Sequence, residues 1–248
     1  MSRALPILFN TEMVKAILDG RKTVTRRIIH RGKSSPQYHG RDKFYGIVNH
    51  LNNDYKNWYA EFYNNNDVFE DSDGEEHIDG IYYKLPYKPG DILYVRETWQ
   101  YLRELDGNEQ TIEGSEKYYY AATDTLPFGA YVDSRGVTHD YIPWRPSIHM
   151  PKEAARIWLK VTDVRVERLQ DITEEQAEKE SGIDNRGFIH SPDNEYSHIH
   201  TALEDFRDNI WNSTIKKSDL DLYGWDANPW VWVIEFKRCE KPKEEIVE

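Results

Sequence analysis

The chain has a single cysteine, Cys239, among its 248 residues, and it has no long apolar run. One thiol cannot form a disulfide within the chain or supply a cysteine-rich zinc site, which favours a reducing compartment. No stretch approaches the roughly 18 apolar residues that a membrane span needs, and the N-terminal residues lack the pattern of an export signal. We therefore expect a cytoplasmic protein without a membrane partner.

Basic residues are also few, because 32 lysines and arginines stand against 44 acidic residues, for a net charge of -12. An acidic surface repels a phosphate backbone, which disfavours extended, non-specific nucleic-acid binding. Residues 21–43 are the exception, with eight basic residues against Asp42, so that this segment is +7 and the rest is -19. The segment has the charge to bind RNA. Its candidate nucleic-acid contacts are Arg21, Arg26, Arg31 and Lys33.

Capping signals and apolar periodicity predict three short helices. Asn10 and Thr11 offer N-caps for a helix over residues 11–19. Thr173 and Gln176 have the spacing of a capping box, which predicts a helix that continues to about residue 181. An apolar face predicts a third helix over residues 201–212.

Four apolar or alternating segments predict strands, at residues 22–29, 92–95, 157–166 and 229–236. In the third of these the apolar phase changes near Asp163, which predicts a bulge or bend. The chain shows no internal repeat and no regular alternation of strands and helices. Scattered strands with two or three short helices are typical of an α+β barrel.

The segment Gly20–Arg27 (GRKTVTRR) resembles the signature of the ASCH domain family, in which a helix precedes Gly-x-Lys-Thr-x-Thr and a trailing arginine. Three further matches follow in the same order along the chain. They are Lys88–Asp91 before an apolar strand, Asp171–Glu180 as the hallmark helix, and Val233–Lys237 as the closing strand. Two longer matches, Tyr94–Trp99 and Trp144–Pro151, are similar to bacteriophage-encoded members, which would work in a host cytoplasm.

The resemblance implies one ASCH-like domain over residues 1–240, a PUA-like β-barrel of the α+β class with short flanking helices. Its core would comprise about residues 5–29, 86–99 and 144–237. The remaining segments are interpreted as two long insertions, about residues 30–88 and 100–143, and a solvated tail, residues 241–248.

The best-understood small bacterial members of this family hydrolyse N4-acetylcytidine to cytidine and acetate. The resemblance therefore implies an amidohydrolase that acts on an acylated or otherwise modified pyrimidine nucleoside or nucleotide. By matching positions, Thr25 would be the nucleophile, Lys22 its base, and Glu180 the acid/base on the nitrogen side. Arg27 matches a family arginine that would hold the oxyanion or the base carbonyl. No cofactor and no metal are expected.

The amine of Lys22 can act as a base near neutral pH only if its pKa falls well below the free value of about 10.4. Desolvation and the like-charged Arg21, Arg26 and Arg27 would lower it. The structural alternative is that Lys22 and Glu180 form an ion pair that holds the first helix in place.

Five further residues are candidate substrate contacts: Arg96, Glu97, Trp99, Trp144 and Arg145. An aromatic plane beside an arginine can sandwich a nucleobase, and an arginine with a glutamate can bind a cytosine-like edge. Buried core tryptophans and a cross-strand ion pair are the alternatives.

A second function stays open, that of an RNA- or modified-nucleic-acid-binding PUA-like module, with or without ribonuclease activity. Its partner would be single-stranded RNA rather than a nucleoside-like small molecule. In that case Arg26 and Arg27 would be a phosphate grip, although both are equally consistent with solvated strand charges.

Overall fold

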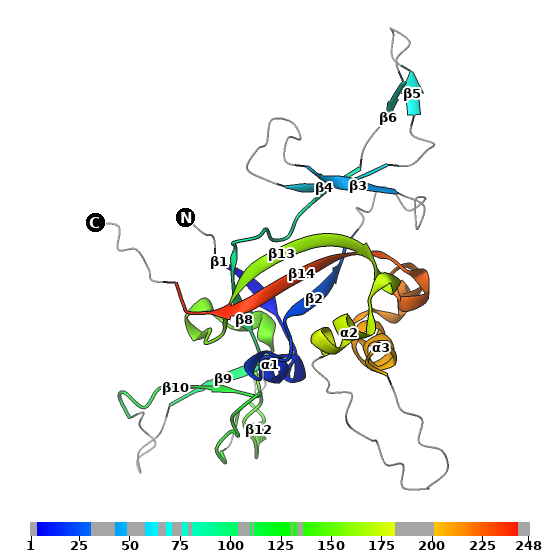
Figure 1. The fold of residues 1–248 in the computed structure, drawn as a ribbon. Helices are drawn as coiled ribbons and strands as arrows, with labels where there is room; N and C mark the ends of the chain where they lie inside the picture. The colour runs from blue at the N-terminus through cyan, green and yellow to red at the C-terminus, as the bar shows by residue number, and fades with distance from the viewer. Residues whose placement is uncertain are drawn as a thin grey trace, which may run out of the picture. The chain divides into compact units, whose positions relative to one another are not determined.

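The protein is described here by a computed structural model, which covers residues 4–30, 43–48, 58–63, 68–70, 76–78, 81–103, 110, 112–129, 131–132, 136–181 and 201–242. It has an α+β fold with several sheets and short helices, as expected (Figure 1). The chain is divided into two compact units. The first comprises residues 1–22, 91–160 and 237–248, and the second comprises residues 23–90 and 161–236.

In the first unit, a parallel pair of strands stands next to a short amphipathic helix. Strand β1 (Ala4–Leu8) pairs with β8 (Ile92–Arg96), and β8 pairs antiparallel with the beginning of β13 (Trp158–Arg168). Helix α1 (Thr11–Leu18) begins at the predicted cap, because Asn10 Oδ1 accepts a hydrogen bond from Met13 N at 2.8 Å. The chain then turns at Gly20, whose φ of 76° favours glycine.

Two small antiparallel sheets complete the strands of this unit. They are β9 (Trp99–Leu102) with β10 (Lys117–Tyr120), and β11 (Tyr131–Val132) with β12 (Thr138–His139). The short 3₁₀ turns η3 (Ser147–His149) and η4 (Lys152–Ala154) follow. Trp99, Met150 and Trp158 share a buried apolar cluster with Tyr94.

In the second unit, β2 (Val24–Ile28) pairs antiparallel with β14 (Trp230–Cys239), and β14 lies beside β13 (Figure 1). The strand order of the five-stranded sheet is β1-β8-β13-β14-β2. Strands β13 and β14 each have residues in both units. This order has two ends, and the described residues show no closed barrel. The closed PUA-like form therefore stays a prediction.

Five further strands of this unit belong to the first expected insertion and form two small antiparallel sheets. Strands β3 (Lys43–Val48), β4 (Tyr59–Tyr63) and β7 (Ile81–Lys84) form the larger one. Strands β5 (Val68–Glu70) and β6 (Glu76–Ile78) form the smaller one.

The described helices of the second unit are short. They are η5 (Leu169–Asp171), α2 (Glu174–Ser181), α3 (Ala202–Asp205), the π-helix η6 (Phe206–Trp211), α4 (Asn212–Thr214), η7 (Lys217–Asp219), α5 (Leu220–Tyr223) and η8 (Trp225–Ala227). Ala177 of α2 and Phe206 of η6 pack against Val24 and Val231 of the sheet in one buried cluster. Among the described helices, none is long and apolar enough to cross a membrane.

The predicted helices are confirmed, although the third is not one regular helix. Thr173 and Gln176 form the reciprocal capping bonds, and α2 is described from Glu174 to Ser181. The segment 201–212 contains α3, a π-helical turn and the start of α4. Strand β13 continues through Asp163 without a break, while its buried positions change from odd to even numbers there.

Candidate functional site

Strand β2 is the end strand of the sheet, and three consecutive residues in it are buried. Val24 belongs to the apolar core, while Thr25 and Arg26 are only 1% and 2% exposed. Side chains alternate across a strand, so Thr25 and Arg26 point to opposite faces, and both faces are covered. Thr25 is therefore a shielded hydroxyl rather than a surface residue.

The last turn of α2 covers the free edge of β2. Thr23 N donates to Lys179 O at 3.3 Å, and Arg26 N donates to the carboxylate of Glu180. Thr25 lies between Thr23 and Arg26 in the chain, so the structure brings Thr25 and Glu180 to the same short stretch of the edge. The carboxylate of Glu180 is only 3% exposed, so it is shielded from solvent beside this edge.

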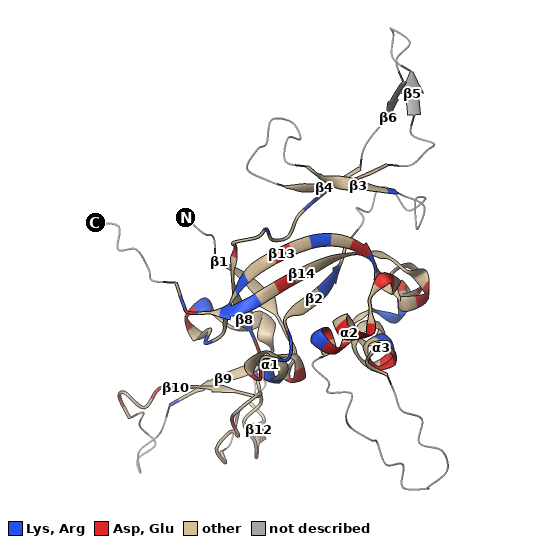
Figure 2. Cartoon of the chain, in the orientation of Figure 1, with Lys and Arg blue, Asp and Glu red and all other residues tan. Residues whose placement is uncertain are grey.

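Arg26 is the centre of a buried polar network. Its Nη1 donates to Glu180 Oε2 at 2.7 Å, and its Nη2 donates to Gln176 Oε1 at 2.7 Å and to Glu167 Oε2 at 3.2 Å. Arg165 extends the network, since it bonds both Glu167 and Glu235. Figure 2 shows the charges of both signs along β13. The sequence left two interpretations of Arg26 open, a phosphate grip or a solvated strand charge. Because Arg26 is buried, it is not a solvated strand charge.

Arg27 shares a face of β2 with Thr25, because the two residues are two positions apart. Burial lowers the pKa of the Arg27 guanidinium, and the nearby carboxylate of Glu180 and the hydroxyl of Tyr87 act in the opposite direction. An arginine so placed stays a cation at neutral pH. A fixed positive charge near Thr25 and Glu180 is what an oxyanion or a carbonyl oxygen requires.

Lys22 belongs to the first unit and is 2% exposed. Its backbone N–H donates to Ala16 O at the end of α1, and its Nζ lies 5.6 Å from the centroid of the Phe9 ring. Lysines are rarely buried to this degree, so the amine has a defined place in the protein. The convergence of Lys22 with Thr25 and Glu180 stays a prediction.

Glu97 is 1% exposed and forms a two-pronged ion pair. Arg156 Nε and Nη2 donate to its two carboxylate oxygens, each at 2.9 Å. The guanidinium of Arg156 also lies 4.0 Å from the centroid of the Tyr120 ring. Arg96 has a different partner, because its Nη1 donates to Ile148 O at 3.2 Å. Arg96 and Glu97 thus have separate structural contacts.

Replacing Arg156 with alanine is expected to lower the free energy of unfolding by about 3 kcal/mol, because the carboxylate of Glu97 would remain buried without its cation. Urea denaturation measures the change. Arg103→Ala is the control, since Arg103 forms an exposed pair with Glu116 at 3.4 Å and should cost less than about 1 kcal/mol. Equal losses in the two variants would contradict the assignment of Glu97 to a structural pair.

The predicted aromatic sandwich is only partly assembled. Trp99 belongs to the apolar cluster of the first unit, and the guanidinium carbon of Arg145 lies 5.3 Å from the centroid of its ring. The two residues also exchange backbone hydrogen bonds of 3.1 and 2.8 Å. Trp144 is half-buried. One face of Trp99 is therefore occupied by Arg145, which favours a packing role for this ring.

The predicted nucleic-acid contacts do not share one environment. Arg21 is exposed and pairs with Asp19 at 2.7 Å, whereas Arg26 is buried in its network. Arg31 and Lys33 lie outside the described residues.

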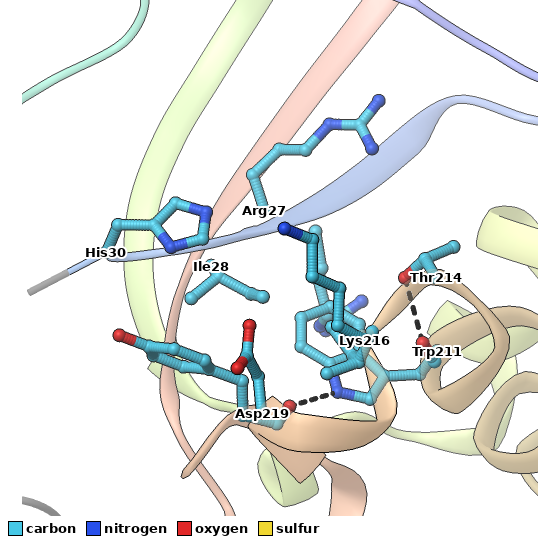
Figure 3. Close-up of a pocket in the computed structure, with 10 residues that line it drawn as sticks. Arg27, Ile28, His30, Trp211, Thr214, Lys216 and Asp219 are labelled. Carbon is cyan, nitrogen blue, oxygen red and sulfur yellow. Dashed lines mark hydrogen bonds between the residues drawn. The ribbon is translucent and has the colours of Figure 1, made fainter.

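A cavity of about 480 Å³ lies beside β2 in the second unit (Figure 3). The sequence motifs pointed only to Arg26 and Arg27 among its residues, and five of the ten lining residues come from the short helices and turns after η6. Its lining consists of Arg26, Arg27, Ile28, His30, Trp211, Thr214, Ile215, Lys216, Asp219 and Tyr223. In Figure 3 the guanidinium of Arg27 points away from Lys216 and Asp219.

No group of His, Cys, Asp and Glu suited to holding a metal ion occurs among the residues that the structure describes. Comparisons with protein-family models, with curated proteins and with solved structures found no match. The function therefore has to be argued from the site itself.

Proposed function

We propose that this protein is an ASCH-type amidohydrolase that removes an acyl group from the exocyclic amine of a modified pyrimidine nucleoside or nucleotide. The observation that carries the proposal is the position of α2, which holds the carboxylate of Glu180 against the residue that follows Thr25. The resemblance to the ASCH family also implies that the sheet belongs to a PUA-like barrel, and this finer description is part of the proposal.

In the proposed reaction, the Thr25 hydroxyl attacks the amide carbonyl carbon and gives its proton to the amine of Lys22. Arg27 balances the negative charge that develops on the carbonyl oxygen. The bond from carbon to the exocyclic nitrogen then breaks, and Glu180 delivers a proton to the departing amine. A water molecule then attacks the acyl-threonine ester and gives a proton to the Glu180 carboxylate, while the ammonium of Lys22 returns its proton to the departing Thr25 oxygen. The carboxylic acid is released, and all three residues regain their starting protonation states.

Three features of the described residues support these roles. Thr25 and Glu180 are both shielded from solvent, which strengthens electrostatic interactions with a substrate. Only Thr23 and Val24 separate Lys22 from Thr25 in the chain, and burial disfavours the charged form of an amine, as a base requires. Arg27 keeps its charge on the same face as Thr25.

The protein is expected to convert N4-acetylcytidine to cytidine, and the conversion can be followed by chromatography. Lys22→Met, which keeps the stem of the side chain and removes the amine, should lower the rate by at least about a hundredfold. Lys15→Met is the matched control, since Lys15 is an exposed residue of α1 that pairs with Glu12. Wild-type protein without turnover, or Lys22→Met with the rate of the control, would overturn the proposal.

A further inference from the structure

The small sheet of β3, β4 and β7 has one face in the core and one face that carries exposed aromatic side chains (Figure 1). On the inner face, Phe44 and Phe62 pack against Trp230, with ring centroids 6.0 and 5.6 Å from it. Side chains alternate across a strand, so the neighbouring Tyr45 and Glu61 lie on the opposite, outer face. Tyr45 is 71% exposed, which is unusual for so large a ring.

A β-bulge holds Tyr45 on this outer face. The register between β3 and β4 shifts between Phe44 and Gly46, so that Tyr45 and Gly46 together face one residue of β4, Glu61. A side-chain carbon added at Gly46 would meet no atom of the described residues within 4 Å. The described residues therefore leave the space beside the Tyr45 ring open to a ligand.

Two further tyrosines share the outer face. Tyr82 of β7 lies opposite Glu61 and is 37% exposed, and the half-buried Tyr59 stands two positions before Glu61 in β4. The Tyr82 hydroxyl donates to Glu61 Oε1 at 2.8 Å, which fixes the direction of this ring. Neighbouring strands are about 4.8 Å apart, so a chain that crosses the sheet passes the three rings in turn. We call Tyr45, Tyr59 and Tyr82 the tyrosine platform.

Two lysines make the outer face positive in an acidic protein. Lys43 and Lys84 are exposed, and each stands two positions from a member of the tyrosine platform on the same strand. With the single carboxylate of Glu61, the described residues of this face have a net charge of 2 - 1 = +1, against -12 for the whole chain. Lys43 is also the last residue of the basic segment 21–43. A phosphate is therefore attracted here and repelled by most of the remaining surface.

This combination fits a single-stranded nucleic acid better than a protein surface. Aromatic rings stack on the faces of unpaired bases, and lysines bind the phosphates that join them. Lysine is depleted at protein–protein interfaces, and among the described residues of the outer face Val48 is the only aliphatic one. The carboxylate of Glu61 can accept a hydrogen bond from the amino group of cytosine.

We propose that the outer face of β3, β4 and β7 binds single-stranded nucleic acid. Bases stack on the tyrosine platform, and phosphates lie beside Lys43 and Lys84. The inference goes beyond the amide hydrolysis and does not require it, because none of these residues has a role in that reaction. If both proposals hold, the modified pyrimidine is one unit of a longer strand.

Fluorescence anisotropy of a short labelled oligocytidylate with the full chain tests the surface. The strand should bind at about 50 mM salt and more weakly at about 200 mM, because phosphate contacts are screened. Tyr45→Ala should weaken binding at least about fivefold, whereas Tyr45→Phe keeps the ring and should keep the affinity. Tyr141→Ala is the matched control, since Tyr141 is 59% exposed and belongs to the other unit.

Lys84→Ala should make the slope of log affinity against log salt shallower by about 0.7, which corresponds to one lost phosphate contact. Three results would overturn the proposal: no binding at low salt, equal affinities of Tyr45→Ala and Tyr141→Ala, or Tyr45→Phe as weak as Tyr45→Ala. The first of these would leave a protein as the partner of this face. Competition by oligodeoxycytidylate would show that the sugar is not recognised, its absence would identify RNA as the ligand, and both results support the surface. The strand carries no acyl group, so failure to bind it would leave the test of the hydrolysis unaffected.

Discussion

Replacing Thr25 with valine is expected to lower the rate of N4-acetylcytidine hydrolysis at least about a thousandfold, because the variant has no hydroxyl to attack the carbonyl carbon. Valine has nearly the shape of threonine and favours strands, so β2 should keep its pairing with β14. Thr25→Ser keeps a hydroxyl and should retain a measurable part of the activity. Initial rates of cytidine release under saturating substrate give the comparison.

The chain contains a matched control for this variant. Thr23 is exposed and stands two residues before Thr25, and only its backbone N–H and C=O take part in the described bonds to α2 and β14. Thr23→Val should therefore have the wild-type rate. If Thr25→Val hydrolyses the amide as fast as Thr23→Val, Thr25 is not the nucleophile. Binding of the nucleoside without turnover in all variants would instead favour the RNA- or nucleoside-binding module.

The local signals of the sequence predicted the elements that carry the site. A capping box involves groups within four residues, so Thr173 and Gln176 could be recognised without knowledge of the rest of the chain. β-Branched residues likewise predicted β2, and an apolar run predicted β14. The division of residues 201–212 into α3, a π-helix and α4 could not be predicted, because hydrophobic periodicity does not distinguish one helical pitch from another over one or two turns.

Contacts between distant residues were beyond the reach of such signals. Arg26 bonds a carboxylate 154 residues away, and Glu97 bonds a guanidinium 59 residues away. Pairing at such separations depends on how the elements pack, and local patterns contain no record of it. Thr25 and Glu180 were selected by resemblance to the ASCH family, whereas Lys216 matched no pattern.

The structure assigns Arg26 a large share of the stability of the second unit, and Arg26→Leu is expected to lower the free energy of unfolding by about 3–5 kcal/mol. The variant leaves the carboxylate of Glu180, 3% exposed, without its cation, and it removes a partner of Glu167 and Gln176. Arg21→Leu is the control, because Arg21 forms an exposed pair with Asp19 that should contribute at most about 1 kcal/mol. Urea denaturation of both variants gives the two values.

Glu180→Gln separates the structural role of this carboxylate from its proposed catalytic one. The amide oxygen of glutamine can still accept the backbone N–H of Arg26, so α2 should stay against the edge of β2, while the charge and the proton that Glu180 would deliver are lost. If Glu180 only holds the helix in place, the hydrolytic activity of Glu180→Gln should fall only in proportion to the fraction of the variant that is folded. If Glu180 protonates the leaving amine, activity should fall by about a hundredfold or more in fully folded protein.

Combining Glu180→Gln with Arg26→Leu should lower the free energy of unfolding by less than the sum of the two single losses, because the carboxylate left unpaired by Arg26→Leu is then absent. Additive losses would show that Arg26 stabilises the unit through Glu167 and Gln176, and not through Glu180.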